Sequence, residues 1–142
     1  MDLNRRVGPV FAVYLVLIVA GIVVAIVIGL VRTSDDPAAA RTVARFSAAI
    51  QQRDGATACR QLSAATIDSL EQQEGADCEK AVLELGLKGG RVAKSDVAER
   101  SAKVDVGEDG SVFLDNTRRG WLITAFACTP VKARPYDCEV KG

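Results

Sequence analysis

The feature that most constrains this chain is an unbroken apolar stretch near its N-terminus. From Val7 to Val31 the sequence has no charged residue and consists mostly of Val, Ile, Leu, Ala and Gly. As a helix the stretch would be about 37 Å long, which exceeds the roughly 30 Å hydrocarbon core of a bilayer. A helix also satisfies every backbone polar group in lipid, where no water is present to do so. We therefore expect a single transmembrane helix over residues 7–32.

The charges that flank this stretch predict its orientation. Arg5 and Arg6 precede it, whereas Arg32 follows it and is itself followed by Asp35 and Asp36. The more basic short flank stays in the cytoplasm. The segments predicted on this basis are a cytoplasmic tail (1–6), a signal anchor in the cell membrane (7–32), a linker (33–37) and an extracytoplasmic domain (38–142).

A cleaved signal peptide is the alternative to an anchor. Signal peptides have an apolar region of about 7–15 residues that ends close to a cleavage site with small residues. Here the apolar run is much longer, and the Ala38-Ala39-Ala40 sequence lies well beyond its end. We therefore favour an uncleaved anchor.

Small residues recur every four positions within the apolar stretch, at Gly21, Ala25 and Gly29. Such a stripe lets two helices approach closely, so it predicts self-association as one hypothesis. Glycine and alanine are also common in membrane spans that do not associate, and we prefer that simpler interpretation.

All four cysteines, Cys59, Cys78, Cys128 and Cys138, follow the apolar stretch. An even number of cysteines in an extracytoplasmic domain indicates disulfides, and no C-x-x-C pair suggests a zinc or thiol-redox site. Three pairings are possible. We favour the sequential one, 59–78 with 128–138, because each bridge then closes a short loop and stabilises one half of the domain by about 3 kcal/mol.

The charge balance excludes several classes of function. Eighteen Lys and Arg residues match eighteen Asp and Glu residues, so the basic excess typical of nucleic-acid binders is absent. The chain contains no histidine, which removes the usual general base, the Ser-His triad and histidine metal ligands. We expect no nucleic-acid partner, no metal and no cofactor, and we assign no catalytic residue.

The first part of the outer domain has the pattern of helices. Asp36 and Pro37 are a typical N-cap and first helical residue, and apolar residues then recur at helical spacing up to Asp54-Gly55. Further helices are predicted over about 56–62 and 64–73, and a fourth after a cap at Asp77. Gly89-Gly90 ends this helical half.

The second part has the pattern of antiparallel strands. Ala102, Val104 and Val106 alternate with charged residues, which is typical of a half-buried strand. Turn residues separate further strands. The predicted strands are 102–106, 111–115, 121–128 and 136–140, with turns at 107–110 and 115–120 and a less certain strand around 92–100. Helices followed by a meander predict an α+β domain with its helices on one face of a curved sheet.

The end of the chain carries a motif in which a Gly-Trp strand leads to a cysteine, a proline-bearing loop and a Tyr-Asp-Cys ending. Its residues are Gly120, Trp121, Cys128, Pro130, Pro135, Tyr136, Asp137 and Cys138. With the order of elements over about 36–142, it resembles the nuclear-transport-factor-2-like cone fold, a cystatin-like architecture. More narrowly, it resembles small membrane-anchored actinobacterial proteins of unknown function. The resemblance implies a curved sheet wrapped against helices with a cavity between them, and it implies no particular activity.

Several side chains are candidates for a binding site. Trp121 and Tyr136 have pocket-lining chemistry, although packing is the more common role of such aromatic residues. Basic residues that could meet anionic lipid or a partner are Arg32, Arg41, Arg45 and the Arg118-Arg119 pair, for which a solvated role is the simpler interpretation. The acidic residues Asp68, Glu71 and Glu74 have no apolar surroundings to shift their pKa values, so we expect an exposed face.

These observations predict a membrane-anchored extracytoplasmic binding or assembly module that is not an enzyme and acts close to the bilayer. Its expected partners are the lipid bilayer and another envelope protein. The alternatives are a carrier for a lipid-like ligand and an enzyme that uses carboxylates or Tyr136, both of which require an open cone cavity.

Overall fold

The computed structural model describes residues 13–23, 37–132 and 134–142 and divides the chain into two units, residues 1–34 and 35–142. In the first unit, residues 13–23 form a helix whose side chains are exposed. Among the residues described, none of the helices has the length and apolar character that crossing a bilayer requires. Most of the predicted span, with Ala25, Gly29 and the flanking arginines, lies outside the described residues, as does the predicted cap Asp36.

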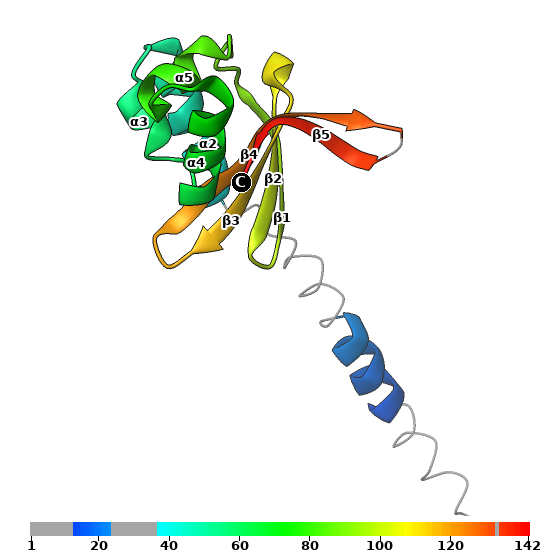
Figure 1. The fold of residues 1–142 in the computed structure, drawn as a ribbon. Coiled ribbons are helices and arrows are strands. Elements are labelled where there is room, and N and C mark those ends of the chain that lie inside the picture. The colour runs from blue at the N-terminus through cyan, green and yellow to red at the C-terminus, as the bar shows by residue number, and fades with distance from the viewer. Residues whose placement is uncertain (1–12, 24–36, 133) are drawn as a thin grey trace, which may run out of the picture. The chain divides into compact units, whose positions relative to one another are not determined.

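The second unit is an α+β domain in which the helices precede a five-stranded antiparallel sheet (Figure 1). Its helices are α2 (Pro37–Gln51), α3 (Gly55–Cys59), α4 (Ala64–Glu74) and α5 (Cys78–Glu84). Its strands are β1 (Val92–Ala98), β2 (Ser101–Val106), β3 (Ser111–Thr117), β4 (Gly120–Val131) and β5 (Arg134–Lys141), with a short 3-10 turn at Gly107–Asp109. The strands lie in the order β1-β2-β3-β4-β5, so each pairs with its neighbour in sequence. The predicted fold class is confirmed at this level.

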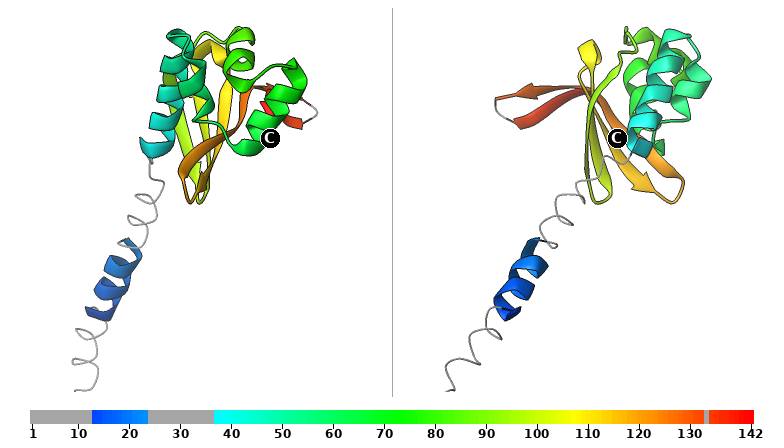
Figure 2. Two further views of the ribbon diagram at one scale, coloured as in Figure 1. Left: turned by 60° about the vertical axis from the view of Figure 1, so that its left-hand side comes forward. Right: turned by 180° about the vertical axis from the view of Figure 1, so that it is seen from behind.

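The apolar positions of α2 form one buried stripe. Val43, Phe46 and Ile50 recur at helical spacing and are at most 7% exposed. The ring of Phe46 lies 5.4 Å from that of Phe126 on β4, which joins the helix to the centre of the sheet. The four helices lie together on one face of the sheet, as the views from two sides show (Figure 2).

The helix termini show why the chain turns where it does. The predicted stop at Asp54-Gly55 lies just after the end of α2 at Gln51. Asp54 has a second role, because its carboxylate accepts the amide of Thr57 at 2.9 Å and caps α3. Ser63 caps α4 in the same way, and Gly75 ends α4 with a left-handed φ of 64°. The cap predicted at Asp77 is wrong in its chemistry, because the Asp77 side chain makes no capping bond. The carboxylate of Glu71 on α4 instead accepts the amide of Cys78 at 2.9 Å.

The sheet extends further than the sequence pattern indicated. The uncertain strand near residue 92 is present as β1, which pairs along β2. The turn predicted over 115–120 is shorter, because Thr117 pairs with Gly120 and only Arg118 and Arg119 form the turn. Strand β4 continues past Cys128 to Val131 and pairs with β5 in a hairpin that extends away from the helices (Figure 1).

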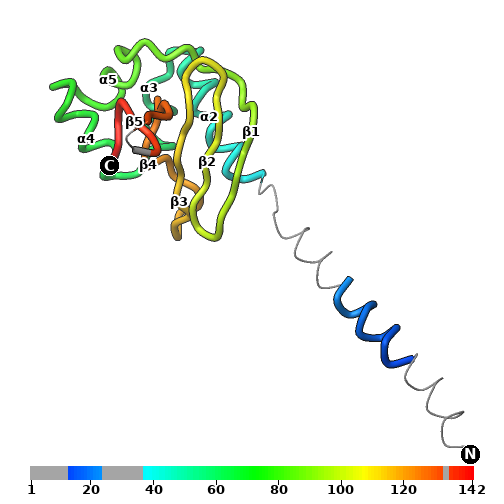
Figure 3. Tube along the Cα trace, turned by 90° about the vertical axis from the view of Figure 1, so that its right-hand side faces the viewer, coloured from blue at the N-terminus to red at the C-terminus, as the bar shows by residue number. Residues whose placement is uncertain are grey.

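Long-range contacts fix α4 against the sheet. The hydroxyl oxygen of Thr66, a fully buried residue, lies 3.1 Å from the carbonyl oxygens of both Ile123 and Thr124 on β4. The amide of Gly142 donates to the Thr124 carbonyl at 2.9 Å, so the end of the described chain lies beside α4 (Figure 3). These bonds hold the segment before α4 close to the first half of β4.

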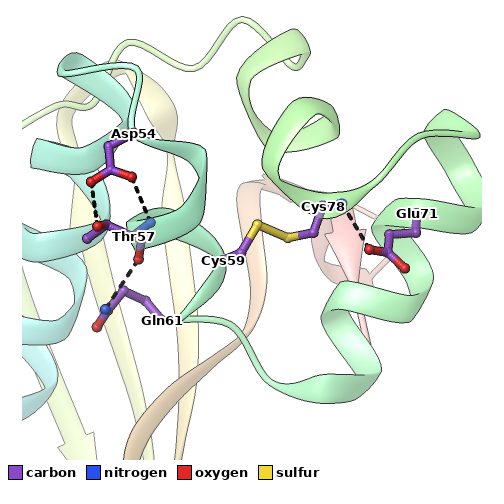
Figure 4. Close-up of a disulfide and its surroundings, with 6 residues drawn as sticks. All are labelled: Asp54, Thr57, Cys59, Gln61, Glu71 and Cys78. Atoms are coloured by element: carbon purple, nitrogen blue, oxygen red, sulfur yellow. Dashed lines mark hydrogen bonds between the residues drawn. A yellow bond between two sulfur atoms is a disulfide. The ribbon is translucent and has the colours of Figure 1, made fainter.

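Two disulfides are present and no cysteine is free. Cys59 at the end of α3 is bonded to Cys78 at the start of α5 (Figure 4). The two helices also approach closely at Gly55, where a Cβ atom would lie 2.0 Å from the carbonyl oxygen of Glu79. The second disulfide joins Cys128 and Cys138, which face each other across β4 and β5. This is the sequential pairing.

Candidate binding site

A surface cleft of about 320 Å³ lies where three segments of the α+β domain meet. We call it the arginine cleft, because four of its lining residues are arginines. The residues that line it are Ala38, Arg41, Thr42 and Arg45 from α2, Arg60 and Gln61 after α3, and Arg119, Gly120, Trp121 and Leu122 from the β3–β4 hairpin. Its size falls at the lower end of the range of about 300–1,000 Å³ that is typical of ligand clefts.

The first turns of α2 provide one wall of the arginine cleft. Its residues from this helix stand at positions i, i+3, i+4 and i+7, so they share one face. Thr42 is buried and its hydroxyl donates to the Ala38 carbonyl at 3.2 Å, which directs the hydroxyl toward the helix backbone. Arg41 and Arg45 are exposed and present their guanidinium groups to the cleft.

The connection between α3 and α4 provides the second wall. The Ile123 amide donates to the Gln61 carbonyl at 2.8 Å, and the Ser63 amide donates to the Ile123 carbonyl at 2.8 Å, so this connection runs alongside β4. Gln61 is held further by its side-chain amide, which donates to the Thr57 carbonyl at 3.4 Å (Figure 4). The position of Arg60 is set by the same contacts, because it directly precedes Gln61.

The β3–β4 hairpin provides the third wall. The Thr117 hydroxyl donates to the Gly120 carbonyl at 2.9 Å, and it accepts the Arg119 amide at 3.1 Å. Gly120 has a φ of 95°, a conformation that favours glycine, and it allows the chain to enter β4 directly after the two-residue turn. Trp121 follows and is 7% exposed, so its ring is largely packed in the core while its edge lines the arginine cleft.

The arginine cleft carries positive charge that the described residues do not neutralise. Among the described residues, none that lines the cleft is acidic and no ion pair involves its four arginines. Arg60 is the most engaged, since it donates to the Thr57 hydroxyl at 2.6 Å. Arg60 also acts on the Asp54 carboxylate. Hydrogen bonds from Thr57 are the main cause of the lowered pKa of Asp54, and the charge of Arg60 is the smallest cause. Like charges at i and i+4, as at Arg41 and Arg45, destabilise a helix by about 0.2–0.5 kcal/mol.

The face of the sheet opposite the helices carries a second polar cluster, formed by Lys103, Asp105, Ser111 and Tyr136. The Lys103 ammonium lies 3.2 Å from Asp105 Oδ1 and donates to the Tyr136 hydroxyl at 3.2 Å, while the Ser111 hydroxyl donates to Asp105 at 2.6 Å. The Tyr136 hydroxyl, followed by Asp105, raises the pKa of Lys103. The Ser111 hydrogen bond, followed by Lys103, lowers the pKa of Asp105. Both side chains are therefore charged at neutral pH and form an ion pair, in which the lowered pKa of Asp105 makes its carboxylate a weak base.

The interior between the helices and the sheet is filled by side chains at the point where a cone cavity would lie. The hollow between α2 and the sheet, lined among others by Phe46, Val106 and Phe126, has a volume of about 10 Å³. A single water molecule needs at least about this volume. The resemblance to the cone fold implied a cavity between helices and sheet, and α2, which packs against β1, β2 and β4, leaves no room for a ligand in this hollow.

The structure brings several predicted residues together and separates others. Arg41, Arg45, Arg119 and Trp121 all line the arginine cleft, whereas Arg118, in the same turn as Arg119, does not. Tyr136 lies in the other cluster, where its ring packs edge-on against Phe113 at 4.9 Å. In the acidic cluster, Glu71 caps α5 and so differs from the exposed role expected of all three residues.

Sequence reasoning missed Arg60, Thr42 and Gln61. Arg60 and Gln61 fall inside the helix predicted over 56–62, and only the long-range pairing of Leu62 with Ile123 places them at the arginine cleft. No local sequence signal reports such a pairing. Thr42 was a polar position within an otherwise apolar stripe, which was the one available indication of a special environment.

Comparison with known proteins yields no match to the chain among family models, curated proteins or solved structures. In the described residues, no group of three or more His, Cys, Asp or Glu side chains could hold a metal ion. The fold and the site therefore define a small disulfide-bonded α+β domain with a cationic surface cleft, and function has to be argued from that geometry.

Proposed function

We propose that this protein is a membrane-anchored extracytoplasmic module that binds a partner at the surface of its α+β domain and is not an enzyme. The observation that carries the proposal is the arginine cleft, in which three segments converge on four arginines without an acidic neighbour among the lining residues. Such an arrangement leaves binding capacity unused within the described chain, as expected of a site whose counter-charge comes from outside.

The location rests on two independent features. The uncharged stretch from Val7 to Val31 is long enough to serve as an anchor over residues 7–32, and the basic flank favours a cytoplasmic N-terminus. Both disulfides fit an oxidising compartment, because cytosolic thiols are normally kept reduced. On this proposal the bilayer is one partner, and self-association through Gly21, Ala25 and Gly29 is a further possibility for the anchor.

The two alternatives have less support. A lipid-like ligand inside the cone needs an apolar cavity, and the hollow between α2 and the sheet is only about 10 Å³. An enzyme that uses Tyr136 needs a strong neighbouring base, yet the Tyr136 hydroxyl accepts from the Lys103 ammonium, and Asp105 is a weak base because Ser111 and Lys103 lower the pKa of its carboxyl. Binding at the surface requires neither feature.

The natural lysines allow a direct test of the location. Every lysine lies between Lys80 and Lys141, and none precedes the outer domain. Intact spheroplasts are treated with a membrane-impermeant amine-reactive ester, and the modified sites are mapped by mass spectrometry. We expect modification of Lys80, Lys88 and Lys94, whose side chains are 71%, 68% and 66% exposed, and protection of the N-terminal amine. Protected lysines with a labelled N-terminus, or four reduced cysteines in the same sample, would overturn the proposal.

The binding role is tested by crosslinking in native membranes. Full-length protein and its Arg119→Gln variant are crosslinked side by side, with Arg118→Gln as the matched control from the same turn. We expect one set of adducts that is lost in Arg119→Gln and kept in Arg118→Gln. Identical adducts in all three proteins would show that the arginine cleft is not the binding surface.

A further inference from the structure

We infer that the arginine cleft binds a phosphate group, carried either by a lipid headgroup or by a soluble phosphate compound. The inference rests on the proposed binding function and adds the chemical class of the ligand. It follows from the charge of the cleft, from the three directions of its arginines and from its fixed backbone.

The charge of the cleft selects an anion. Arg41, Arg45, Arg60 and Arg119 contribute four positive charges to the lining of a cleft of about 320 Å³, and no described acidic residue lines it. Arginine remains charged at all relevant pH values, so this charge cannot be relieved by loss of a proton. A bound anion would supply the counter-charge that the described lining residues do not provide.

The convergence of the arginines favours phosphate over a single carboxylate. The guanidinium groups come from α2, from the α3–α4 connection and from the β3–β4 turn, so they approach from three directions. A carboxylate has two oxygens in one plane and is satisfied by one or two guanidinium forks. A phosphate group presents three or four acceptor oxygens in a tetrahedral arrangement, which matches donors that converge from several sides.

The backbone beneath the arginines is held in place before any ligand binds. The Gln61–Ile123 hydrogen bond fixes the α3–α4 connection at 2.8 Å, and the Thr117 hydroxyl fixes the β3–β4 turn through bonds of 2.9 and 3.1 Å. The first disulfide holds the end of α3 one residue before Arg60. Ligand binding then orders the side chains alone, which lowers its entropic cost.

Two sources of phosphate have the same chemistry. The cleft residue Ala38 follows the apolar stretch by only seven positions in the sequence (38 − 31 = 7). If that stretch is the proposed anchor, only a short length of chain separates the cleft from lipid headgroups. The volume of the cleft also accepts a soluble diphosphate. The experiment therefore includes a separate arm for each source.

The single tryptophan of the chain provides the signal. Trp121 is the one tryptophan in the sequence, and it lines the arginine cleft. The full-length protein in non-ionic detergent micelles is titrated at constant ionic strength while tryptophan emission is recorded. The soluble arm uses inorganic pyrophosphate, and the lipid arm uses micelles doped with short-chain phosphatidic acid, with phosphatidylcholine as its control. Citrate serves as the carboxylate comparator.

We expect a saturable change in emission with pyrophosphate, phosphatidic acid or both, and none with phosphatidylcholine. Citrate should bind at least about tenfold more weakly, and Arg119→Gln should weaken phosphate binding about tenfold or more, as expected for loss of a charge-assisted hydrogen bond. The matched variant Arg118→Gln should bind like the natural protein. An Arg41→Gln, Arg45→Gln double variant gives a second test on a different wall.

Three results would overturn the inference: no change with either phosphate probe, citrate binding as tightly as pyrophosphate, or equal losses in Arg118→Gln and Arg119→Gln. Binding in one arm alone supports the inference and identifies the source. The lysine-labelling test is independent of these titrations, because it reports location and not affinity. Failure of the ligand class is thereby distinguished from failure of the proposed function.

Discussion

The arginine cleft and the Lys103 cluster are both groups of charged side chains on the α+β domain, yet they differ in how their charges are balanced. In the Lys103 cluster each charge has a partner, since Asp105 accepts from Ser111 and faces Lys103 at 3.2 Å. In the arginine cleft, no described acidic residue lines the site. A balanced cluster supports the fold, whereas an unbalanced one indicates a site that a ligand completes. Whether charged side chains have partners therefore says more about their role than how many of them there are.

The largest expected effect comes from removing the disulfides, because only the Cys59–Cys78 bridge adjoins the arginine cleft. Replacing Cys59 and Cys78 with Ala should lower the free energy of unfolding by about 3 kcal/mol in the loop-entropy description and should also weaken pyrophosphate binding, because α3 leads directly into Arg60. Replacing Cys128 and Cys138 should reduce stability by a similar amount and leave binding unchanged. Denaturant unfolding and Trp121 titrations of the full-length proteins measure both quantities. Equal binding losses in the two pairs would remove the distinction.

The next effect concerns the balanced cluster. Asp105→Ala should lower the free energy of unfolding by about 1 kcal/mol, because the Ser111 hydroxyl loses its acceptor and the partly buried Lys103 loses its counter-charge, keeping only the Tyr136 hydroxyl. Phosphate binding should not change. Urea unfolding of this variant beside Asp115→Ala, an exposed carboxylate on β3, provides the comparison. A neutral result for Asp105→Ala would mean that the cluster does not support the fold.

The balanced cluster should also respond to pH. The pKa of Asp105 is lowered from its ordinary value of 3.8, so its contribution to stability is present above that value and is lost as the pH falls through the lowered pKa. The pKa of Lys103 is raised from 10.5, so its contribution is present below 10.5 and is lost as the pH rises through the raised pKa. Unfolding free energies of the natural protein and Asp105→Asn, measured from pH 2 to 6, should converge at the acidic end. Parallel curves would contradict the assignment.

The smallest effect is the most diagnostic, because its sign is unusual. Replacing Arg41 and Arg45 with Ala should raise the free energy of unfolding by about 0.2–0.5 kcal/mol in phosphate-free buffer, since repulsion at i and i+4 is removed. Saturating pyrophosphate should reverse the order, because it stabilises only the protein that binds it. Thermal unfolding with and without pyrophosphate, with Arg118→Ala as control, measures the change. Destabilisation without the anion would show that these arginines already have partners.

The sequence allowed the helical half and most of the sheet to be predicted, because their determinants are local. The spacing of Val43, Phe46 and Ile50 indicates a buried helix face, and the alternation from Ala102 to Val106 indicates a half-buried strand. The loss of the Asp77 cap to Glu71 depends on how α4 and α5 pack, a contact that no local pattern reports. The extension of β3 to Thr117 likewise depends on its partner strand.

The candidate site was harder to predict for the same reason. Arg41, Arg45, Arg119 and Trp121 each attracted attention singly, but they are separated by up to 80 positions (121 − 41 = 80) and only the fold brings them together. Their isolation in sequence favoured the interpretation that each arginine is merely solvated. The bridge between Leu62 and Ile123, which adds Arg60, has no counterpart in composition or periodicity.

The short spans of the two disulfides bear on how the protein matures. Their cysteines are only 19 and 10 positions apart, and each pair lies within one local unit, α3 to α5 or the β4–β5 hairpin. On the proposed topology, Cys59 and Cys78 both emerge before Cys128 during N-to-C export, so the first bridge can close while the chain still consists of the helical part alone. Oxidation can then proceed sequentially, without an isomerase having to undo cross-links between the two halves.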